Sequence, residues 1–292
     1  GDQCGDDQIV GGLRQNLFEA IGLHPGRGAP VSDLKDLFPE DDFGFRLPLR
    51  RSAPADFFAP SADGAAMLRE RTKWLEQAPQ DYAVMSDGAR AGWNEFAELA
   101  SAWSGETVSA DPIQAGRQLE PDVVLLSRDR DGRFRVSGGV VVFPSHWSLP
   151  EKIGLTLLEV HGVVPGLNAA IGPAIDKYLD KIKPGFAAGR PNWGLAATDA
   201  WNLHPSVDAP KLEAGLGADQ MWLRVERQIL TPLPQSGDML FGIRIERIRL
   251  NHVLNDPEVR SRFHRTVATM PSEVAAYKGL TNVIDSLVEM TG

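Results

Sequence analysis

The sequence contains, at residues 221–229, the stretch MWLRVERQI, in which apolar and polar side chains alternate as they do along a half-buried β-strand. Three polar side chains share one face of this strand: Arg224, Glu226 and Gln228. A turn-forming run at residues 234–238 follows, and a second alternating segment extends from Met239 to Ile245. The two segments therefore predict an antiparallel hairpin.

Shorter strands are predicted upstream of this hairpin. Residues 123–126, 134–136 and 138–143 are runs rich in β-branched side chains, and Arg130-Asp131-Gly132 is a turn signal between the first two. These runs indicate a second hairpin or a meander. Together with the later hairpin they predict an antiparallel sheet of about five strands.

Two helices are predicted between the halves of the sheet. The S-x-x-E spacing of Ser148 and Glu151, with a proline in the first turn, is typical of a capping box, and we expect the first helix to extend from there to Gly162. His161 then lies at the C-terminal edge of that helix. The second helix carries apolar residues at helical spacing up to Ile182.

Helical spacing of apolar residues also occurs at both ends of the chain. We expect a disordered segment at residues 1–12, a helical extension at 13–118, the sheet-containing core at 119–252, and helices packing on that core at 253–292. The fold class predicted from the residues is therefore α+β, an antiparallel β-sheet core with inserted helices and helical N- and C-terminal extensions.

Composition argues against several classes of function. Lys and Arg number 30 against 39 Asp and Glu, a formal charge of -9, whereas a nucleic-acid-binding protein more often carries a basic excess. The longest apolar runs, such as residues 139–143, are far below the roughly 20 residues that cross a bilayer. The single cysteine, Cys4, can neither form an internal disulfide nor hold an iron–sulfur cluster alone. We therefore expect a cytoplasmic protein with neither nucleic acid nor membrane as a partner.

The histidines give little support to a preformed zinc or di-iron site, because six occur without any HxH, HxxxH or HExxH pair. No G-x-S-x-G, Walker A or G-x-G-x-x-G motif occurs either. A haem, by contrast, requires only one axial side chain within apolar walls, and a lone histidine at a helix edge such as His161 can supply it. The alternative for His161 is a helix C-terminal histidine favoured by the helix dipole.

The polar face of the strand at 221–229 also has two interpretations. On alternation alone it is the solvated side of a half-buried sheet. The density of polar residues nearby favours a functional site instead, since Arg190, Asn192 and Trp193 are expected in one short loop and Pro-Ser-His-Trp forms a turn at residues 144–147.

A series of short motifs, in a fixed order, resembles a known family. They are FPS at 143–145, Trp147, KIG at 152–154, Val160-His161, Val164-Pro165, Arg190-x-Asn192-Trp193, LRVERQ at 223–228, Leu233-Pro234, FGIR at 241–244 and Tyr277-Lys278-Gly279. This set is similar to the α subunit of haem-dependent oxidative N-demethylases, over roughly residues 45–285. The resemblance implies a PAS-like haem-binding core at residues 119–252 and an oxygenase that uses O2 to remove a methyl group from a small secondary amine, dimethylamine in the characterised case.

The resemblance also implies cofactors and partners. Haem b is expected on this chain, whereas FMN, a 2Fe–2S cluster and NADPH are expected on a reductase partner, with tetrahydrofolate as the acceptor of the one-carbon product. The lone cysteine fits that division of labour. The alternative function is a PAS-like haem-based sensor or haem carrier without turnover.

Residue roles follow from the same resemblance. His161 is the expected axial ligand of the haem iron, and Glu226 is the expected catalytic residue, which binds the amine and polarises oxygen. Arg190 and Arg224 are expected to bind the haem propionates or to hold the polar network of the pocket. Three further residues are expected in the cofactor pocket: Asn192, Trp193 and Gln228.

Overall fold

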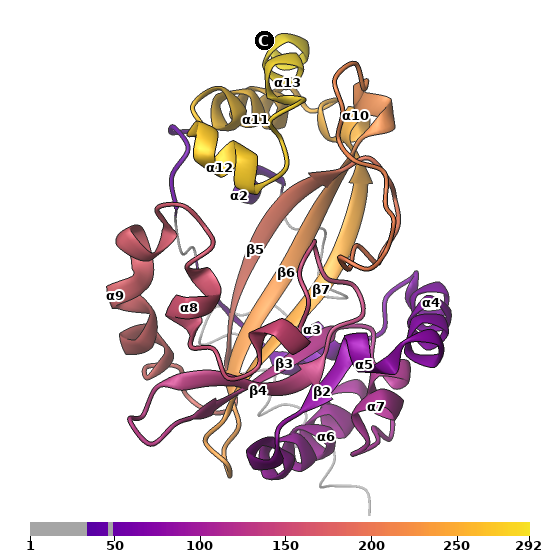
Figure 1. The fold of residues 1–292 in the computed structure, drawn as a ribbon, viewed down its shortest axis with the longest axis vertical. Helices are drawn as coiled ribbons and strands as arrows, with labels where there is room; N and C mark the ends of the chain where they lie inside the picture. Colours follow the sequence, from indigo (N-terminus) through magenta and orange to yellow (C-terminus); the bar gives the residue numbers. More distant parts are fainter. Residues whose placement is uncertain (1–33, 46–48) are drawn as a thin grey trace, which may run out of the picture. The chain divides into compact units, whose positions relative to one another are not determined.

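The computed structural model describes residues 34–45 and 49–292, and its central element is a seven-stranded antiparallel sheet (Figure 1). The strands are β1 (Arg50–Ser52), β2 (Ala83–Met85), β3 (Asp122–Arg128), β4 (Phe134–Val140), β5 (Ala187–Ala196), β6 (Trp222–Pro232) and β7 (Met239–Arg249). Their order across the sheet is β1-β5-β6-β7-β3-β4-β2. The predicted α+β class and antiparallel sheet are confirmed. Three of the strands were not expected, namely β1 and β2, which are too short to show a periodicity, and β5.

Both predicted hairpins are present. β6 and β7 pair along their whole lengths, and β3 pairs with β4 around a turn that contains Gly132. The two runs predicted at 134–136 and 138–143 form the single strand β4, which ends at Val140. A glycine is required within β4, because a Cβ on Gly139 would lie 2.2 Å from the carbonyl oxygen of Val123.

The strand β5 corrects the prediction of a short loop around Arg190, Asn192 and Trp193. These residues lie within a ten-residue strand that pairs with β6. Periodicity did not reveal it, because glycine, proline and asparagine are depleted in strands. Pro191 is tolerated because, within the described chain, β1 pairs only with residues 187–189 and leaves the rest of that edge without a neighbouring strand.

The first inserted helix begins later than predicted. The segment η2 (Pro150–Lys152) is a short 3-10 helix without a side-chain cap, so the capping box expected there is absent. Thr156 and Glu159 form a capping box instead, and α8 (Leu157–His161) follows it. His161 therefore does end a helix, as predicted, and the second inserted helix is α9 (Leu167–Leu179).

Further helices precede and follow the main strands. Those before β3 are α2 (Leu34–Leu37), α3 (Pro54–Phe58), α4 (Gly64–Gln77), α5 (Pro79–Tyr82), η1 (Asp87–Ala89), α6 (Arg90–Ser104) and α7 (Pro112–Gln118). Those after β5 are η3 (Ala218–Gln220), α10 (Leu250–Val253), α11 (Pro257–Ala268), α12 (Ser272–Tyr277) and α13 (Ile284–Thr291). The segment predicted at 1–12 and the start of the helical extension fall outside the described residues. Among the described helices, none has the length and apolar character that a bilayer crossing requires.

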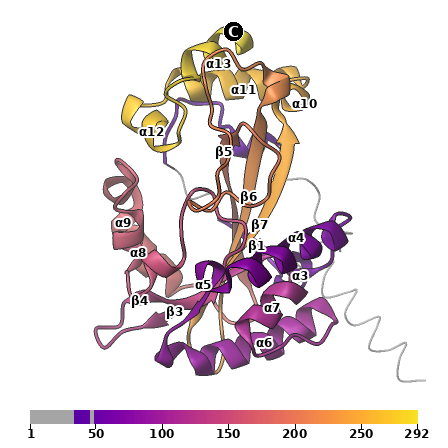
Figure 2. The same cartoon turned by 45° about the vertical axis from the view of Figure 1, so that its right-hand side comes forward.

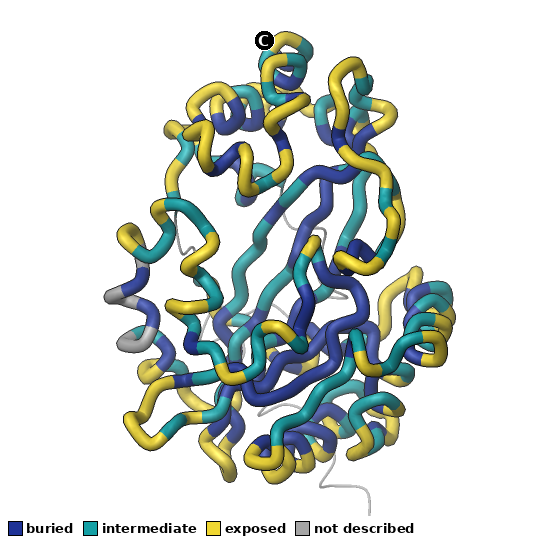
Figure 3. The backbone as a smooth tube through the Cα atoms, in the orientation of Figure 1, coloured by how far each residue is buried: buried dark blue, intermediate teal, exposed yellow. Residues whose placement is uncertain are grey.

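Three apolar clusters pack these helices on the sheet. The first joins α3 to α7 with β3 and β7, the second joins α10 to α13 with one face of β5 and β6, and the third joins α9 with β3 and β4. Figure 2 shows the helices of the first two clusters at opposite ends of the long strands. The residues of the central strands are accordingly buried or half-buried along almost their whole length (Figure 3).

A buried ion pair joins the N-terminal helices to the sheet. Arg71 of α4 and Asp122 of β3 are 0% and 2% exposed, and Arg71 Nη1 donates a hydrogen bond of 2.6 Å to Asp122 Oδ1. The carboxylate also accepts the backbone N–H groups of Val142, at 2.7 Å, and Phe143, at 3.0 Å. Asp122 therefore fixes the chain directly after β4.

We expect Asp122→Asn to lower the free energy of unfolding by about 3–5 kcal/mol, because it leaves the guanidinium of Arg71 buried without its counter-ion. Urea denaturation measures the change. The matched control is Asp180→Asn, which breaks the exposed ion pair with Arg128 and should cost at most about 1 kcal/mol. Equal losses in the two variants would contradict the importance of the buried pair.

Candidate functional site

The polar faces of β5 and β6 form one surface. The register places Arg190 opposite Gln228, Asn192 opposite Glu226, and Gly194 opposite Arg224. Side chains that face one another across antiparallel strands lie on the same side of the sheet. The structure therefore brings most of the predicted site residues together.

Trp193 is directed to the other side of the sheet. It is 8% exposed, belongs to the cluster under the C-terminal helices, and its ring lies 5.2 Å from that of Phe38 in an edge-to-face arrangement. Its carbonyl oxygen nevertheless accepts a hydrogen bond from Lys278. The contacts of its side chain are those of a core residue.

Glu226 is held at one of its two carboxylate oxygens. Oε2 accepts hydrogen bonds from Gln228 Nε2 at 2.8 Å and from Asn192 Nδ2 at 3.1 Å. Oε1 receives no hydrogen bond from any described residue, although Glu226 is only 8% exposed. One oxygen is thus positioned and the other is left available to a ligand.

His161 and Arg190 lie close enough to affect each other's ionisation. Burial lowers the pKa of the His161 imidazole, and the charge of Arg190 lowers it further. Burial also lowers the pKa of Arg190, and Glu226 partly offsets this. His161 Nδ1 and Arg190 Nε are both buried without a hydrogen-bond partner in the described structure. Unpaired buried polar atoms are costly. Others occur elsewhere in the described chain, for example Arg71 Nη2 and Trp93 Nε1. What distinguishes His161 and Arg190 is that they lie close to each other.

Two residues that the sequence analysis did not assign to the site reach it from the C-terminal region. Lys278, directly after α12, donates from Nζ to the carbonyl oxygen of Trp193 at 2.8 Å. Burial lowers the pKa of Lys278 to about 8, Glu226 opposes this shift, and Arg190 adds to it. Burial and the charge of Glu226 raise the pKa of Tyr277. The only sequence signal for either residue was the motif Tyr277-Lys278-Gly279 in the resemblance.

Arg224 has a different environment from Arg190. Each of its three guanidinium nitrogens donates to the protein: Nε to Ser145 Oγ at 2.8 Å, Nη1 to the carbonyl of Ala200 at 3.2 Å, and Nη2 to the carbonyl of Trp201 at 2.6 Å. Nη2 also bonds the carbonyl of Phe143 at 2.7 Å. These contacts favour the second predicted role, holding the polar network, over propionate binding.

The network of Arg224 fixes a strained turn beside the site. His146 has a left-handed φ of 62°, and its backbone N–H donates to the carbonyl of Leu203 at 3.0 Å. Such a conformation persists in a residue other than glycine when its surroundings hold it in place. Arg224 therefore holds the turn at residues 144–147 against its own end of the polar strand face.

The surroundings of His161 suit a large, flat, apolar cofactor. Leu158, one helical turn before it on α8, and Val163, just after it, are 42% and 59% exposed. A haem needs one axial ligand, apolar walls and a cation for its propionates. His161, the exposed apolar side chains and Arg190 match these needs.

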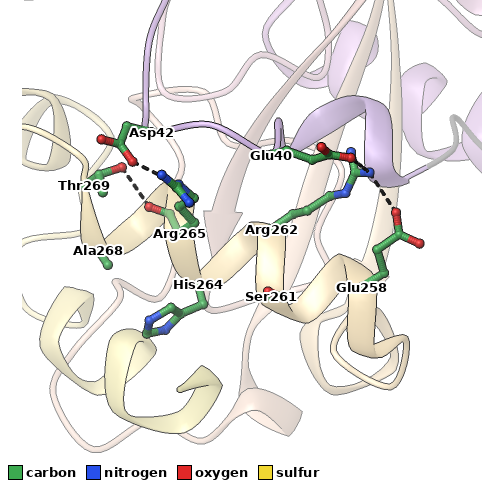
Figure 4. A pocket seen from close by; sticks show the side chains of 9 residues that line it. All are labelled: Glu40, Asp42, Glu258, Ser261, Arg262, His264, Arg265, Ala268 and Thr269. Carbon is green, nitrogen blue, oxygen red and sulfur yellow. Dashed lines mark hydrogen bonds and ion pairs between the residues drawn. The ribbon is translucent and has the colours of Figure 1, made fainter.

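Other parts of the described chain provide weaker candidates for a metal or ligand site. No group of three or more His, Cys, Asp or Glu side chains that could hold a bare metal ion occurs among the described residues. A surface pocket of about 630 Å³ lies along α11 (Figure 4). Its charged groups are engaged with one another, Arg262 with Glu40 and Glu258, and Arg265 with Asp42. None of the predicted site residues lines it.

A family model described as "Haem-dependent oxidative N-demethylase, alpha subunit-like" matches residues 75–288. The match spans most of the chain and includes every residue of the polar strand face, the helix that ends in His161, and Lys278.

We expect two substitutions to move the pKa of Lys278 in opposite directions from its value of about 8. Glu226→Gln should lower it, because the ammonium loses a nearby anion, and Arg190→Gln should raise it, because a nearby cation is removed. Lysine side-chain NMR titration measures both shifts. Glu273→Gln, on α12 but without an influence on Lys278, is the control and should leave the pKa unchanged. Shifts of the same sign in the first two variants would rule out this charge cluster.

Proposed function

The chain belongs to the haem-dependent oxidative N-demethylase α-subunit-like family, and we propose that it is an oxygenase subunit that binds haem b and demethylates a small secondary amine such as dimethylamine. The observation that carries the proposal is the proximity of His161 and Arg190, each with a buried nitrogen that no described residue pairs, to the carboxylate of Glu226. A buried group of this kind costs free energy unless a ligand completes it.

Two residues would hold the haem. His161 would be the axial ligand, since its Nδ1 is buried without a hydrogen-bond partner in the described structure and burial favours its neutral, ligating form. Arg190 would bind a propionate, because a guanidinium fork matches a carboxylate. Haem bound there would supply the redox chemistry, in which O2 accepts two electrons from the amine and two from a reductase, and its oxygen atoms leave in formaldehyde and water.

Glu226 would bind the substrate. A secondary amine is protonated at neutral pH, and Oε1 of Glu226 is the carboxylate oxygen without a hydrogen bond from the described residues. Asn192 and Gln228 fix Oε2, so the orientation of the free oxygen is set before the amine arrives. An ion pair formed in such a poorly solvated place is stronger than one formed in water.

The electron supply is assigned to other subunits. The family description names an alpha subunit, which implies an assembly of several subunits. Cluster types such as 2Fe–2S need several cysteine ligands, and this sequence has one cysteine. We therefore place the 2Fe–2S cluster, the FMN and the NADPH site on a reductase partner, with tetrahydrofolate accepting the one-carbon product.

Substitution of His161 tests the haem assignment. His161→Ala should abolish the magnetic circular dichroism signature of histidine-ligated haem, and Arg190→Gln should weaken haem affinity by roughly tenfold or more, as loss of a charge-assisted hydrogen bond would. His264→Ala, on α11, is the control and should behave as wild type. A His161→Ala protein with unchanged haem ligation would refute the assignment.

Substitution of Glu226 tests the substrate assignment. Glu226→Gln keeps the shape of the side chain and removes its charge, so dimethylamine should no longer perturb the haem absorbance at concentrations that saturate the wild type. Asp199→Asn, in a loop outside the polar strand face, should leave the response intact. An unchanged response in Glu226→Gln would disprove this role. Amine-dependent NADPH consumption with a reductase separates an enzyme from the alternative, a haem sensor without turnover.

A further inference from the structure

Gly194 leaves an open space on the polar strand face. It lies opposite Arg224, and the neighbouring cross-strand pair is Asn192 with Glu226. The residue is half-buried, yet a Cβ built on it would meet no atom within 4 Å, and its φ lies outside the left-handed region. Neither crowding nor backbone conformation therefore requires a glycine at this position.

Other glycines of the sheet differ from Gly194. A Cβ on Gly138 would lie 2.6 Å from Met85 Sδ, and one on Gly242 would lie 2.7 Å from Phe57 Cε1. Those two glycines are explained by close packing of protein atoms. A glycine within a strand that packs against nothing is a common sign of close approach by a ligand.

The space at Gly194 lies within reach of a molecule bound to Glu226. Diagonal neighbours on one face of an antiparallel pair are about 7–8 Å apart at their Cα atoms. An ammonium group bonded to Glu226 Oε1 would therefore bring its alkyl substituents over Gly194. We infer that Gly194 sets the size of the amine that the site accepts, an inference that rests on the proposed function.

The walls around this space are fixed, which makes its size selective. Arg224 is 3% exposed and is tied to Ser145 Oγ and to the carbonyls of Phe143 and Trp201. Asn192 is bonded to Glu226 on the other side. Neither side chain can move away from a larger ligand without breaking hydrogen bonds. A difference of one methylene group in a fitted site changes binding by about 10- to 200-fold.

The test is a calorimetric measurement of the dissociation constants of dimethylamine and diethylamine, with the full chain supplemented with haem. In Gly194→Ala, the dissociation constant of dimethylamine should stay within about threefold of its wild-type value. The dissociation constant of diethylamine should rise about tenfold or more above its wild-type value. In Gly194→Val both amines should bind more weakly than to wild type. Gly189→Ala is the matched control, because it lies on the same strand but on the opposite face, where its Cβ would make an ordinary contact of 3.5 Å with Ser52.

Thermal unfolding separates loss of the site from loss of the fold. Gly194→Val should unfold at the same or a higher temperature than wild type, since a β-branched residue replaces glycine in a strand with room for it. Equal weakening of both amines in Gly194→Ala, or no weakening of either, would overturn the inference. Loss of haem from Gly194→Ala would also overturn it, because the space would then belong to the cofactor. Failure of haem-loaded wild type to bind any amine would overturn the proposed function, and this inference with it.

Discussion

The carboxylate of Asp122 is the constraint on which the arrangement of the site depends. It neutralises the buried Arg71 and accepts the backbone N–H groups of Val142 and Phe143. The carbonyl of Phe143 in turn accepts a hydrogen bond from Arg224 on β6. A continuous set of buried polar contacts therefore runs from the N-terminal helices to the strand that carries Glu226. Removing one partner of such a network leaves charges without compensation, which is why it specifies one geometry strongly.

Arg224 and Arg190, on neighbouring strands, differ in how their guanidinium groups are paired. Arg224 has a partner for every guanidinium nitrogen, and burial lowers its pKa to about 10. Arg190, one strand away, keeps a buried Nε without a partner beside His161, whose Nδ1 is also unpaired. Burying such groups without a partner costs free energy. Their proximity to each other supports the proposed haem and amine site.

The sequence revealed only part of this arrangement, for physical reasons that differ by element. The alternation at residues 221–229, which only Trp222 and Arg227 interrupt, predicted β6 and its polar face, because packing on one side of a sheet imposes a period of two. β5 was not predicted, because it contains glycine, proline and asparagine, which have low strand propensity. Pro191 is tolerated there because this part of β5 lies at the edge of the described sheet. Lys278 is brought to Trp193 and Glu226 by long-range packing of α12, which no local pattern encodes. The placement of His161 at a helix end was predicted from the sequence. The capping box was predicted at Ser148 and Glu151, whereas the structure has it at Thr156 and Glu159.

The proposed site of this member of the family combines three groups: His161 for the iron, Arg190 for a propionate, and one carboxylate oxygen of Glu226 for an amine. The most direct measurement is the visible absorbance spectrum of the wild-type protein supplemented with haem and titrated with dimethylamine. The account predicts a Soret band of protein-bound, histidine-ligated haem that shifts saturably as the amine is added. A spectrum identical to that of free haem would contradict it.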